Sequence, residues 1–248
     1  MSIDDDRDFE GLRETGRIVR AALEAMRAAV VPGITTGELD AIGGRVMRER
    51  GARSAPQLVY RFPGVTCISV NDELVHGIPS LKRRLVEGDL VKLDATFEKN
   101  GYMADAAITV PVGRVSPRAA ALAACAERAF ECALLEVRPG RRVRDVGAAI
   151  EREVRREGFS VVPTLQGHGI GRTIHEEPMV PNWDDPAACA VLVEGLVITV
   201  EPIIAMGAGD AFESGDGWTI RTTDGSLAAH HEHTLVVTKH GPVLLTAA

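Results

Sequence analysis

An internal repeat is the feature that most restricts how this chain of 248 residues can fold. Segments of the first half recur in the second half at a constant offset, so that position 32 corresponds to position 139. The matching segments are Pro32-Gly33 and Pro139-Gly140, Glu38-Leu39 and Asp145-Val146, Gly51 and Gly158, Pro56 and Pro163, Val86-Glu87-Gly88 and Val193-Glu194-Gly195, and Asp94 and Glu201. A constant offset indicates a duplicated structural unit. We therefore predict one domain, residues 1–248, made of similar halves at about 1–112 and 113–248.

Each half is predicted to begin with two helices. Apolar residues recur at helical spacing before Pro32-Gly33 ends the first pattern, and the alanine-rich stretch 117–137 ends in the same way at Pro139-Gly140. A second amphipathic helix is expected at 36–50 and at 143–157. Gly51 and Gly158 follow these helices, where C-terminal caps usually lie.

Strands are predicted after each helix pair. The stretches 91–96 and 102–110 flank Asn100-Gly101, which is a strong hairpin signal, and 196–204 and 230–238 read as the matching strands of the second half, with a longer insert between them. The predicted fold class is α+β, with helix-helix-strand halves related by a pseudo-twofold axis and an antiparallel-rich curved sheet that helices cover on one face. The open face is the expected place for a functional cleft.

The first half brings two carboxylates together. A two-residue turn at Asn100-Gly101 places Asp105 opposite Thr96, and Asp94 lies two residues from Thr96 on the same face of the sheet. Two carboxylates this close, among apolar neighbours, would repel each other and be poorly solvated. A bound cation would remove this conflict.

The second half supplies a matching pair. Glu201 and Glu232 both lie in strand-like sequence, and the repeat equates Asp94 with Glu201 and suggests that Asp105 corresponds to Glu232. A lone acidic residue would more often lie on the solvated face of its strand. Two symmetry-related pairs instead predict four carboxylates that converge on the pseudo-twofold axis.

Histidines complete the predicted site. His168 lies between glycines, which leave room for close approach by a metal or substrate, and is the expected fifth ligand, whereas His76 and His175 are candidate acid-base or hydrogen-bonding groups. One imidazole and four carboxylates suit Mn²⁺, Fe²⁺, Co²⁺ or Zn²⁺. Four negative charges favour two ions, and two ions about 3.5–4 Å apart would activate a bridging water for hydrolysis.

Composition excludes several other classes of protein. The four cysteines include no C-x-x-C pair, so neither a zinc knuckle nor a disulfide framework is predicted. The formal net charge of −7 argues against a nucleic-acid surface. The chain starts Met1-Ser2-Ile3-Asp4-Asp5-Asp6, unlike a secretory signal, and contains no apolar run of membrane-spanning length. We expect a cytoplasmic protein that does not bind membranes.

The candidate residues belong to a series of motifs along the chain: Asn71-Asp72-Glu73-Leu74-Val75-His76-Gly77-Ile78-Pro79, Asp94, Asp105, Gly167-His168-Gly169-Ile170-Gly171, His175-Glu176-Glu177-Pro178, Thr199-Val200-Glu201-Pro202 and Glu232-His233-Thr234. This series resembles type I methionine aminopeptidase over nearly the whole chain. The resemblance implies a pita-bread fold and two divalent ions bound by Asp94, Asp105, His168, Glu201 and Glu232, with Asp105 and Glu232 bridging.

The resemblance also implies a reaction and roles for the remaining residues. A hydroxide that bridges the metals would remove the N-terminal methionine from nascent proteins and peptides, with His175 stabilising the oxyanion, His76 contacting the peptide nitrogen and Glu201 a candidate for proton transfer. Four residues resemble the positions that line the methionine pocket: Tyr60, Phe62, Cys67 and Trp218. The expected partner is the N-terminal peptide of a nascent protein, at the ribosome, and the expected state is a monomer.

Some features depart from the common pattern or leave alternatives. His230-His231 precede Glu232 where other side chains are usual, and we predict that these histidines are solvated or lie outside the ligand set, although a weak metal contact is another reading. One alternative function is cleavage of X-Pro bonds, as in aminopeptidase P or prolidase, although those enzymes generally carry a separate N-terminal domain. The other is a non-catalytic pita-bread module that binds peptides.

Overall fold

The computed structural model describes residues 1–247 and is a sheet-centred α+β fold. The helices are α1 (Asp6–Ala29), α2 (Thr36–Glu49), α3 (Ala55–Tyr60), α4 (Pro117–Leu134) and α5 (Val143–Arg156). The strands are β1 (Arg53–Ser54), β2 (Cys67–Val70), β3 (Glu73–Val75), β4 (Leu90–Lys99), β5 (Tyr102–Pro111), β6 (Ser160–Val161), β7 (Gly167–Gly169), β8 (Glu176–Val180), β9 (Val197–Val200), β10 (Ile203–Ala205), β11 (Ala211–Glu213), β12 (Ile220–Thr222), β13 (Ala228–His230), β14 (Glu232–Val236) and β15 (Val243–Leu244).

The repeat seen in the sequence recurs in the backbone hydrogen bonds. The amide of Gly33 donates to the carbonyl of Leu85 at 2.8 Å, and the amide of Gly140 donates to the carbonyl of Leu192 at 2.9 Å. Both partners are displaced by the offset found in the sequence. The same offset relates two isolated β-bridges, Thr35 with Arg84 and Arg142 with Val191. The two halves therefore share local structure as well as sequence, and the predicted duplicated fold is confirmed.

The helices begin and end at the predicted signals. α2 starts with a capping box, in which the Thr35 side chain and the Glu38 backbone and side chain pair reciprocally. Gly51 and Gly158 follow α2 and α5 with φ values of 68° and 70°, the left-handed conformation that glycine adopts at low cost. α4 ends at Leu134, which is earlier than the predicted end at 137.

The hairpin of β4 and β5 has the predicted register. Asn100 and Gly101 form its turn with positive φ values of 52° and 85°, as a type I′ turn requires. Thr96 lies opposite Asp105 and Asp94 opposite Ala107. These strands belong to the main sheet, whose order is β1-β4-β5-β14-β9-β7-β8, with β2 paired to β4 and β15 to β14.

Two predicted strands of the second half are each broken in two. The stretch 196–204 becomes β9 and β10, and 230–238 becomes β13 and β14. Pro202 has no amide hydrogen and cannot continue the ladder of β9, so β10 leaves the main sheet and pairs with β13 and β6. The breaks fall directly beside Glu201 and Glu232, so that both glutamates lie where the chain passes from one sheet to the other.

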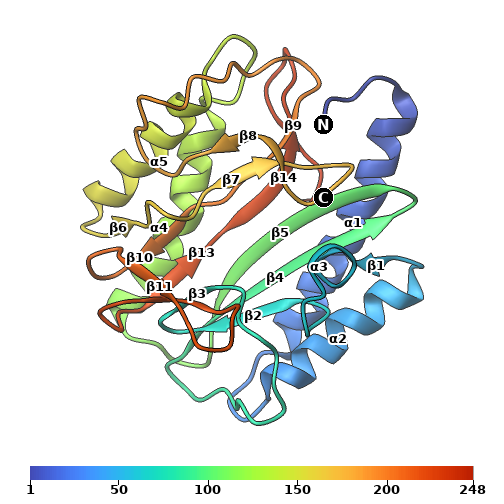
Figure 1. Cartoon of the computed structure of the whole chain (residues 1–248). Helices are drawn as coiled ribbons and strands as arrows, with labels where there is room; N and C mark the ends of the chain where they lie inside the picture. Colours follow the sequence, from blue (N-terminus) through green and yellow to red (C-terminus); the bar gives the residue numbers. More distant parts are fainter. Residues whose placement is uncertain (248) are drawn as a thin grey trace.

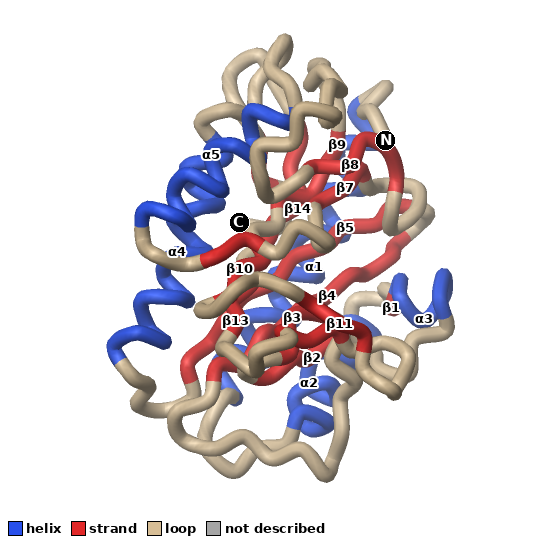
Figure 2. Tube along the Cα trace, turned by 60° about the vertical axis from the view of Figure 1, so that its left-hand side comes forward, coloured by secondary structure: helices blue, strands red, loops and turns tan. Residues whose placement is uncertain are grey.

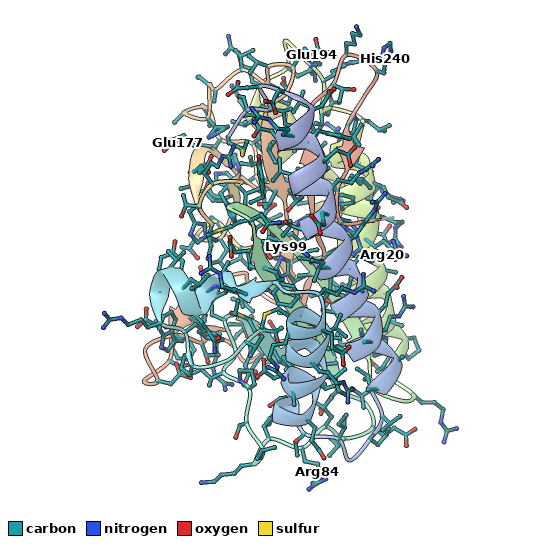
Figure 3. All side chains as sticks on the ribbon, turned by 90° about the vertical axis from the view of Figure 1, so that its right-hand side faces the viewer. Arg20, Arg84, Lys99, Glu177, Glu194 and His240 are labelled. Carbon is teal, nitrogen blue, oxygen red and sulfur yellow. The ribbon has the colours of Figure 1, made fainter. Side chains whose placement is uncertain are left out.

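Helices cover one face of the main sheet and leave the other open. α1 passes behind β4 and β5 in the view of Figure 1 and contacts both strands. Seen along the sheet, α1 with Arg20 lies on one side, whereas α3 and the segment of Glu177 lie on the other (Figure 3). Figure 2 shows α4 and α5 at one side of the strands and α3 at the opposite side. No helix within residues 1–247 has the length and apolar character needed to cross a bilayer.

Each helix pair packs its own hydrophobic core. One cluster joins α1 and α2 to β2, β4 and β5, and includes the fully buried Leu39 and Phe97. A second cluster joins α4 and α5 to β9, β10 and β14, and includes the fully buried Leu122 and Ile198. Burial of apolar surface is the main stabilising contribution to such a layer. The two cores hold the two halves of the sheet as a rigid platform for the open face.

Candidate metal centre

A cavity of about 280 Å³ opens on the face of the sheet that the helix pairs leave free. All of the predicted site residues line this cavity: Tyr60, Phe62, Cys67, His76, Asp94, Asp105, His168, His175, Glu201, Trp218 and Glu232. They come from six helices and strands, α3, β2, β4, β5, β7 and β14, and from five loops, and both halves contribute. Only the tertiary fold brings them together.

A row of directly paired residues crosses the floor of the cavity. Cys67 on β2 lies opposite Asp94 on β4, Asp94 lies opposite Ala107 on β5, and Ala107 lies opposite Glu232 on β14. Directly paired residues point to the same face of a sheet, and strands lie about 4.8 Å apart. Because Ala107 has only a methyl group, the space between Asp94 and Glu232 is free of side chain. Asp105, two residues before Ala107, projects to the same face.

Glu201 and His168 are coupled through Thr199. The Thr199 hydroxyl donates to Oε1 of Glu201 at 3.0 Å and accepts the backbone amide of His168 at 3.0 Å. The backbone carbonyl of Glu201 also accepts from the side-chain amide of Asn182 at 2.9 Å. These contacts hold Glu201 at the end of β9, where strand pairing has stopped.

The orientation of His168 is set by its own strand. Nδ1 lies 2.8 Å from the carbonyl oxygen of Gly169, which can only accept, so Nδ1 carries the proton and Nε2 offers a lone pair. Nε2 lies 3.6 Å from Oε1 of Glu201. This is the arrangement typical of a metal-binding histidine, whose second nitrogen donates to a carbonyl or carboxylate.

The prediction that the glycines beside His168 make room for a metal or substrate is wrong. A Cβ atom on Gly167 would lie 2.6 Å from the carbonyl oxygen of Thr199, and one on Gly169 would lie 2.4 Å from that of Glu177. The space is therefore taken by neighbouring strands, not by a metal or substrate. Glycine is needed here because β7 is packed tightly between β8 and β9.

His175 and His76 lie above the carboxylates. The His175 ring centroid is 4.3 Å from that of His168, and its Nδ1 is 2.6 Å from the hydroxyl of Tyr60. His76 has a φ of 58°, a left-handed conformation that is costly for a residue with a side chain. Burial, followed by the neighbouring His175, lowers the pKa of His76 to about 4, and burial lowers the pKa of His175. Both imidazoles are therefore neutral near pH 7.

The carboxylates are held in an environment that disfavours their charge. Burial, and then the charge of Asp105, raise the pKa of both Asp94 and Glu232 well above the usual range, and the same two causes raise that of Glu201. Burial raises the pKa of Asp105 to about 6. Such shifts indicate negative charge that no cationic side chain neutralises. A bound cation would stabilise the charged form of these carboxylates.

The donor atoms also fit divalent ions. Ligand atoms of Asp105, His168 and Glu232 lie within 4.8 Å of one another, and so do those of Glu201, His230 and Glu232. Among residues 1–247, Oδ1 of Asp105 and Oε1 of Glu232 are buried without a hydrogen-bond partner. Buried oxygens without partners are costly unless something binds them. The residues present therefore fit a divalent metal centre, with Asp94 at its edge, partly exposed to the cavity.

Phe62, Trp218 and Cys67 form an apolar part of the cavity lining. Phe62 and Trp218 pack edge to face with ring centroids 5.2 Å apart, and Cys67 is buried beside Asp94. Burial raises the pKa of Cys67 well above the usual range, so its sulfur is a neutral thiol. Tyr60 is 42% exposed and turns its hydroxyl toward His175. Tyr60 lines the cavity, and its polar contact with His175 was not anticipated.

His230 is buried, so one of the positions predicted for it is excluded. It was expected to be solvated or to lie outside the ligand set, with a weak metal contact as another reading. It is not solvated, because it is only 2% exposed and its Nε2 faces Glu201 and Glu232. Burial lowers its pKa to about 3, so it is a neutral imidazole. The two-residue spacing from Glu232 was the available signal, since residues two apart on one strand share a face. The predicted continuous strand 230–238 should have placed them together.

Comparisons with known proteins agree with this geometry. Residues 10–239 match the model of metallopeptidase family M24. The chain is 46% identical to methionine aminopeptidase 2 of Bacillus subtilis over 247 residues, which covers 99% of each chain. The crystal structure of methionine aminopeptidase from Thermotoga maritima is 33% identical, covers 100% of each chain and superposes with a TM-score of 0.97. A prolidase from Pyrococcus furiosus shares the fold, with a TM-score of 0.79 at 22% identity, and this chain covers 65% of it.

Proposed function

The chain belongs to metallopeptidase family M24, and from this premise we propose that it removes the N-terminal methionine from proteins and peptides by metal-dependent hydrolysis. The observation that carries the proposal is the convergence of Asp94, Asp105, His168, Glu201 and Glu232 from both halves on one cavity. Relatives named methionine aminopeptidase cover nearly the full length of the chain.

We assign these five residues as the ligands of two divalent ions, with Asp105 and Glu232 shared between them. When bound, the ions would acidify a water molecule and polarise the scissile carbonyl group. The donor set suits Mn²⁺, Fe²⁺, Co²⁺ and Zn²⁺. Thr199 and Gly169 support the ligands, because they orient the carboxylate of Glu201 and the ring of His168 through hydrogen bonds.

His175 is the proposed donor to the oxyanion that develops on the scissile carbonyl. A neutral imidazole must carry a proton on the nitrogen that faces the substrate in order to donate. The Tyr60 hydroxyl lies at hydrogen-bonding distance from Nδ1 of His175. If Tyr60 donates to Nδ1, the proton of His175 resides on Nε2, which is then free to donate. Tyr60 is therefore proposed to orient His175 as well as to line the rim.

His76 and Glu201 are proposed to act on the peptide nitrogen. His76 is fixed by its left-handed backbone, and Gly77 after it could not be any larger residue, since a Cβ there would lie 2.3 Å from the carbonyl oxygen of Ile68. His76 is then positioned to hydrogen-bond the amide nitrogen. Glu201 is the candidate for moving a proton to the leaving amine, because its Oε2 is not engaged by Thr199.

The methionine side chain is proposed to enter between Phe62, Cys67 and Trp218. The edge-to-face pair of Phe62 and Trp218 offers the ring edges and faces that a thioether contacts favourably. The neutral thiol of Cys67 adds a small apolar wall. We propose that this pocket, which ends at the cavity floor near Asp94, favours an unbranched side chain.

The finer features of the expected biology are also proposals. The substrate is the N-terminal peptide of a nascent protein, met at the ribosome in the cytoplasm, and the enzyme acts as a monomer. The support is the family membership and the size of the cavity, which admits the end of a peptide chain but not a folded domain. Contact with nucleic acid or membrane is not part of the proposal.

The decisive experiment titrates the metal-free protein with Mn²⁺, Fe²⁺, Co²⁺ and Zn²⁺ and follows release of methionine from Met-Ala-Ser. Saturable release at two equivalents of metal is the expected result. An X-Pro peptide serves as the comparison substrate, because cleavage of that peptide alone would assign the chain to the prolidase-like activity. Metal binding without cleavage of either peptide would favour a binding module.

A further inference from the structure

His230 is a buried imidazole at the metal centre with no assigned role. Its side chain is 2% exposed, and within the described residues 1–247 neither ring nitrogen has a hydrogen-bond partner. A buried polar group without a partner is costly, and few such groups occur in folded proteins. The ring lines the cavity, and Nε2 is the nitrogen that faces the carboxylates of Glu201 and Glu232.

The distances around His230 match a coordination shell better than a hydrogen bond. Its Nε2 lies 3.5 Å from Oε2 of Glu232 and 3.8 Å from Oε2 of Glu201. Hydrogen bonds from nitrogen to oxygen are shorter, at about 2.7–3.2 Å. Two atoms bound to one tetrahedral ion at about 2.0–2.2 Å are instead separated by roughly 3.4 Å.

His168 provides an internal reference for this spacing. Its Nε2 lies 3.6 Å from Oε1 of Glu201, so the two imidazoles approach the two oxygens of the same carboxylate at similar distances. His168 is already assigned as a ligand on other grounds. Glu201 therefore stands between two imidazole nitrogens, each placed beside a carboxylate oxygen as a metal ligand would be.

We propose that Nε2 of His230 is a sixth protein ligand of the metal centre, binding the ion held by Glu201 and Glu232. The ligand role of His230 rests on the proposed function in one respect, because both require divalent ions in the same cavity. Because Glu201 is not among the shared ligands, its ion would then have two imidazole ligands, His168 beside Oε1 and His230 beside Oε2. A second imidazole makes the donor set softer and favours Zn²⁺ or Co²⁺ over Mn²⁺.

The backbone of His230 is held in place by a side chain of the first half. The Thr109 hydroxyl accepts the amide of His230 and donates to its carbonyl, both at 2.8 Å. In addition, His230 pairs with Ile203, two residues after Glu201. The backbone that carries the ring is thus fixed from both sides before any ion binds, as expected of a preorganised ligand.

His231 offers a matched control. It is the adjacent histidine, but its ring packs against Phe130 at a centroid distance of 5.2 Å, and it does not line the cavity. His230→Gln and His231→Gln therefore remove the same group on neighbouring residues, of which only one faces the centre. Glutamine keeps a polar side chain of similar reach but cannot supply an imidazole nitrogen.

The test counts imidazoles at the metal and measures affinity. X-ray absorption of the Zn²⁺-loaded protein should show two coordinated imidazoles per ion pair in the wild type and in His231→Gln, but one in His230→Gln. Calorimetric titration should show a loss of Zn²⁺ affinity of at least about tenfold in His230→Gln, with a smaller loss for Mn²⁺.

A wild-type spectrum with a single imidazole would overturn the proposal by itself, even if the His230→Gln variant failed to fold. So would an unchanged imidazole count in a folded His230→Gln protein, which would make His230 a hydrogen-bonding neighbour of Glu201. Methionine release from Met-Ala-Ser is measured on the same wild-type sample. Loss of the proposed function would appear there, whereas the imidazole count reports on His230 alone.

Discussion

The hydroxyl of Thr234 is hydrogen-bonded twice to the backbone of Asp105. It accepts the Asp105 amide at 2.8 Å and donates to the Asp105 carbonyl at 2.7 Å. Thr234 lies two residues after Glu232 on β14, so this pair of bonds links the strands that carry Asp105 and Glu232, the two carboxylates proposed to be shared between the ions. The spacing between Asp105 and Glu232 is therefore set by a side chain that touches neither a metal nor a substrate.

Thr234→Val should weaken both the fold and the centre. Valine keeps the branched shape but leaves two buried backbone groups of Asp105 without partners, which costs about 1–3 kcal/mol for each group. Urea unfolding of the metal-free protein measures this loss, and calorimetry measures the accompanying fall in metal affinity. Thr234→Ser keeps the hydroxyl and should behave much more like the wild type. Equal effects of the two substitutions would show that packing of the methyl group, and not hydrogen bonding, is what matters.

Glu232→Gln should change stability in opposite directions with and without metal. In the metal-free protein it removes one of several buried, mutually repelling charges, which should stabilise the fold by about 1 kcal/mol, or roughly 2–4 °C in Tm. Addition of Co²⁺ or Mn²⁺ should raise the Tm of the wild type strongly but that of the variant little. Differential scanning calorimetry of both proteins in chelator and in metal measures these changes in Tm.

His76→Ala should keep the metal-induced rise in Tm while turnover falls.

Tyr60→Phe should lower turnover without loss of metal. The substitution removes the 2.6 Å contact to His175 and leaves the ring in place. Loss of one orienting hydrogen bond of about 1 kcal/mol corresponds to a threefold to tenfold fall in kcat/KM. Metal content by atomic absorption should be unchanged. Wild-type kinetics in the variant would mean that the tyrosine hydroxyl does not control which nitrogen of His175 carries the proton.

Trp218→Ala should weaken binding of methionine more than it slows the reaction. Trp218 is partly exposed and forms one wall of the proposed pocket with Phe62, so its removal opens the pocket without emptying a core. KM for Met-Ala-Ser should rise about tenfold, with a smaller change in kcat. Steady-state kinetics across a range of peptide concentrations separates the two. A fall in kcat alone, with KM unchanged, would contradict a role of Trp218 in binding methionine.

Glu98→Gln should destabilise the protein in a manner that depends on pH. Glu98 accepts from Arg53 and from the amide of Gly101 in the hairpin turn, both at 2.7 Å. The Arg53 hydrogen bond, aided by that of Gly101, lowers the pKa of Glu98 below its ordinary value of 4.5. A lowered pKa means that this stabilisation is present above pH 4.5 and is lost as the pH falls through the folded-state value.

Because Arg53 is largely exposed, the expected difference at pH 7 is only about 1 kcal/mol. Urea unfolding of metal-free wild type and Glu98→Gln at pH 7 and pH 3.5 tests this, and the difference should be smaller at the lower pH, which lies below the ordinary pKa of 4.5. A difference of the same size at both values would assign the effect to the shape of the side chain. The ligand carboxylates titrate in both proteins and so cancel in the comparison.

Rules for repeats, turns and strands were sufficient to predict how Asp94 and Asp105 are placed in the first half. The offset repeat predicted two related units, and the Asn100-Gly101 turn set the register that pairs Asp105 with Thr96, because a two-residue turn leaves one way for its flanking strands to pair. Since side chains alternate along a strand, the common face of Asp94 and Asp105 followed from counting residues.

Contacts between segments distant in sequence decided the rest. Counting residues along the chain could not show that the second-half strands break beside Glu201 and Glu232. Nor could it show that Ala107 leaves space between two carboxylates, or that Tyr60 contacts His175, 115 positions away in the sequence. The buried position of His230 likewise depends on Thr109 from the other half. The sequence by itself determined which residues would line the cavity and, for Asp94 and Asp105, which face they share. The tertiary structure decided their distances and partners, because those depend on how two separately packed halves meet.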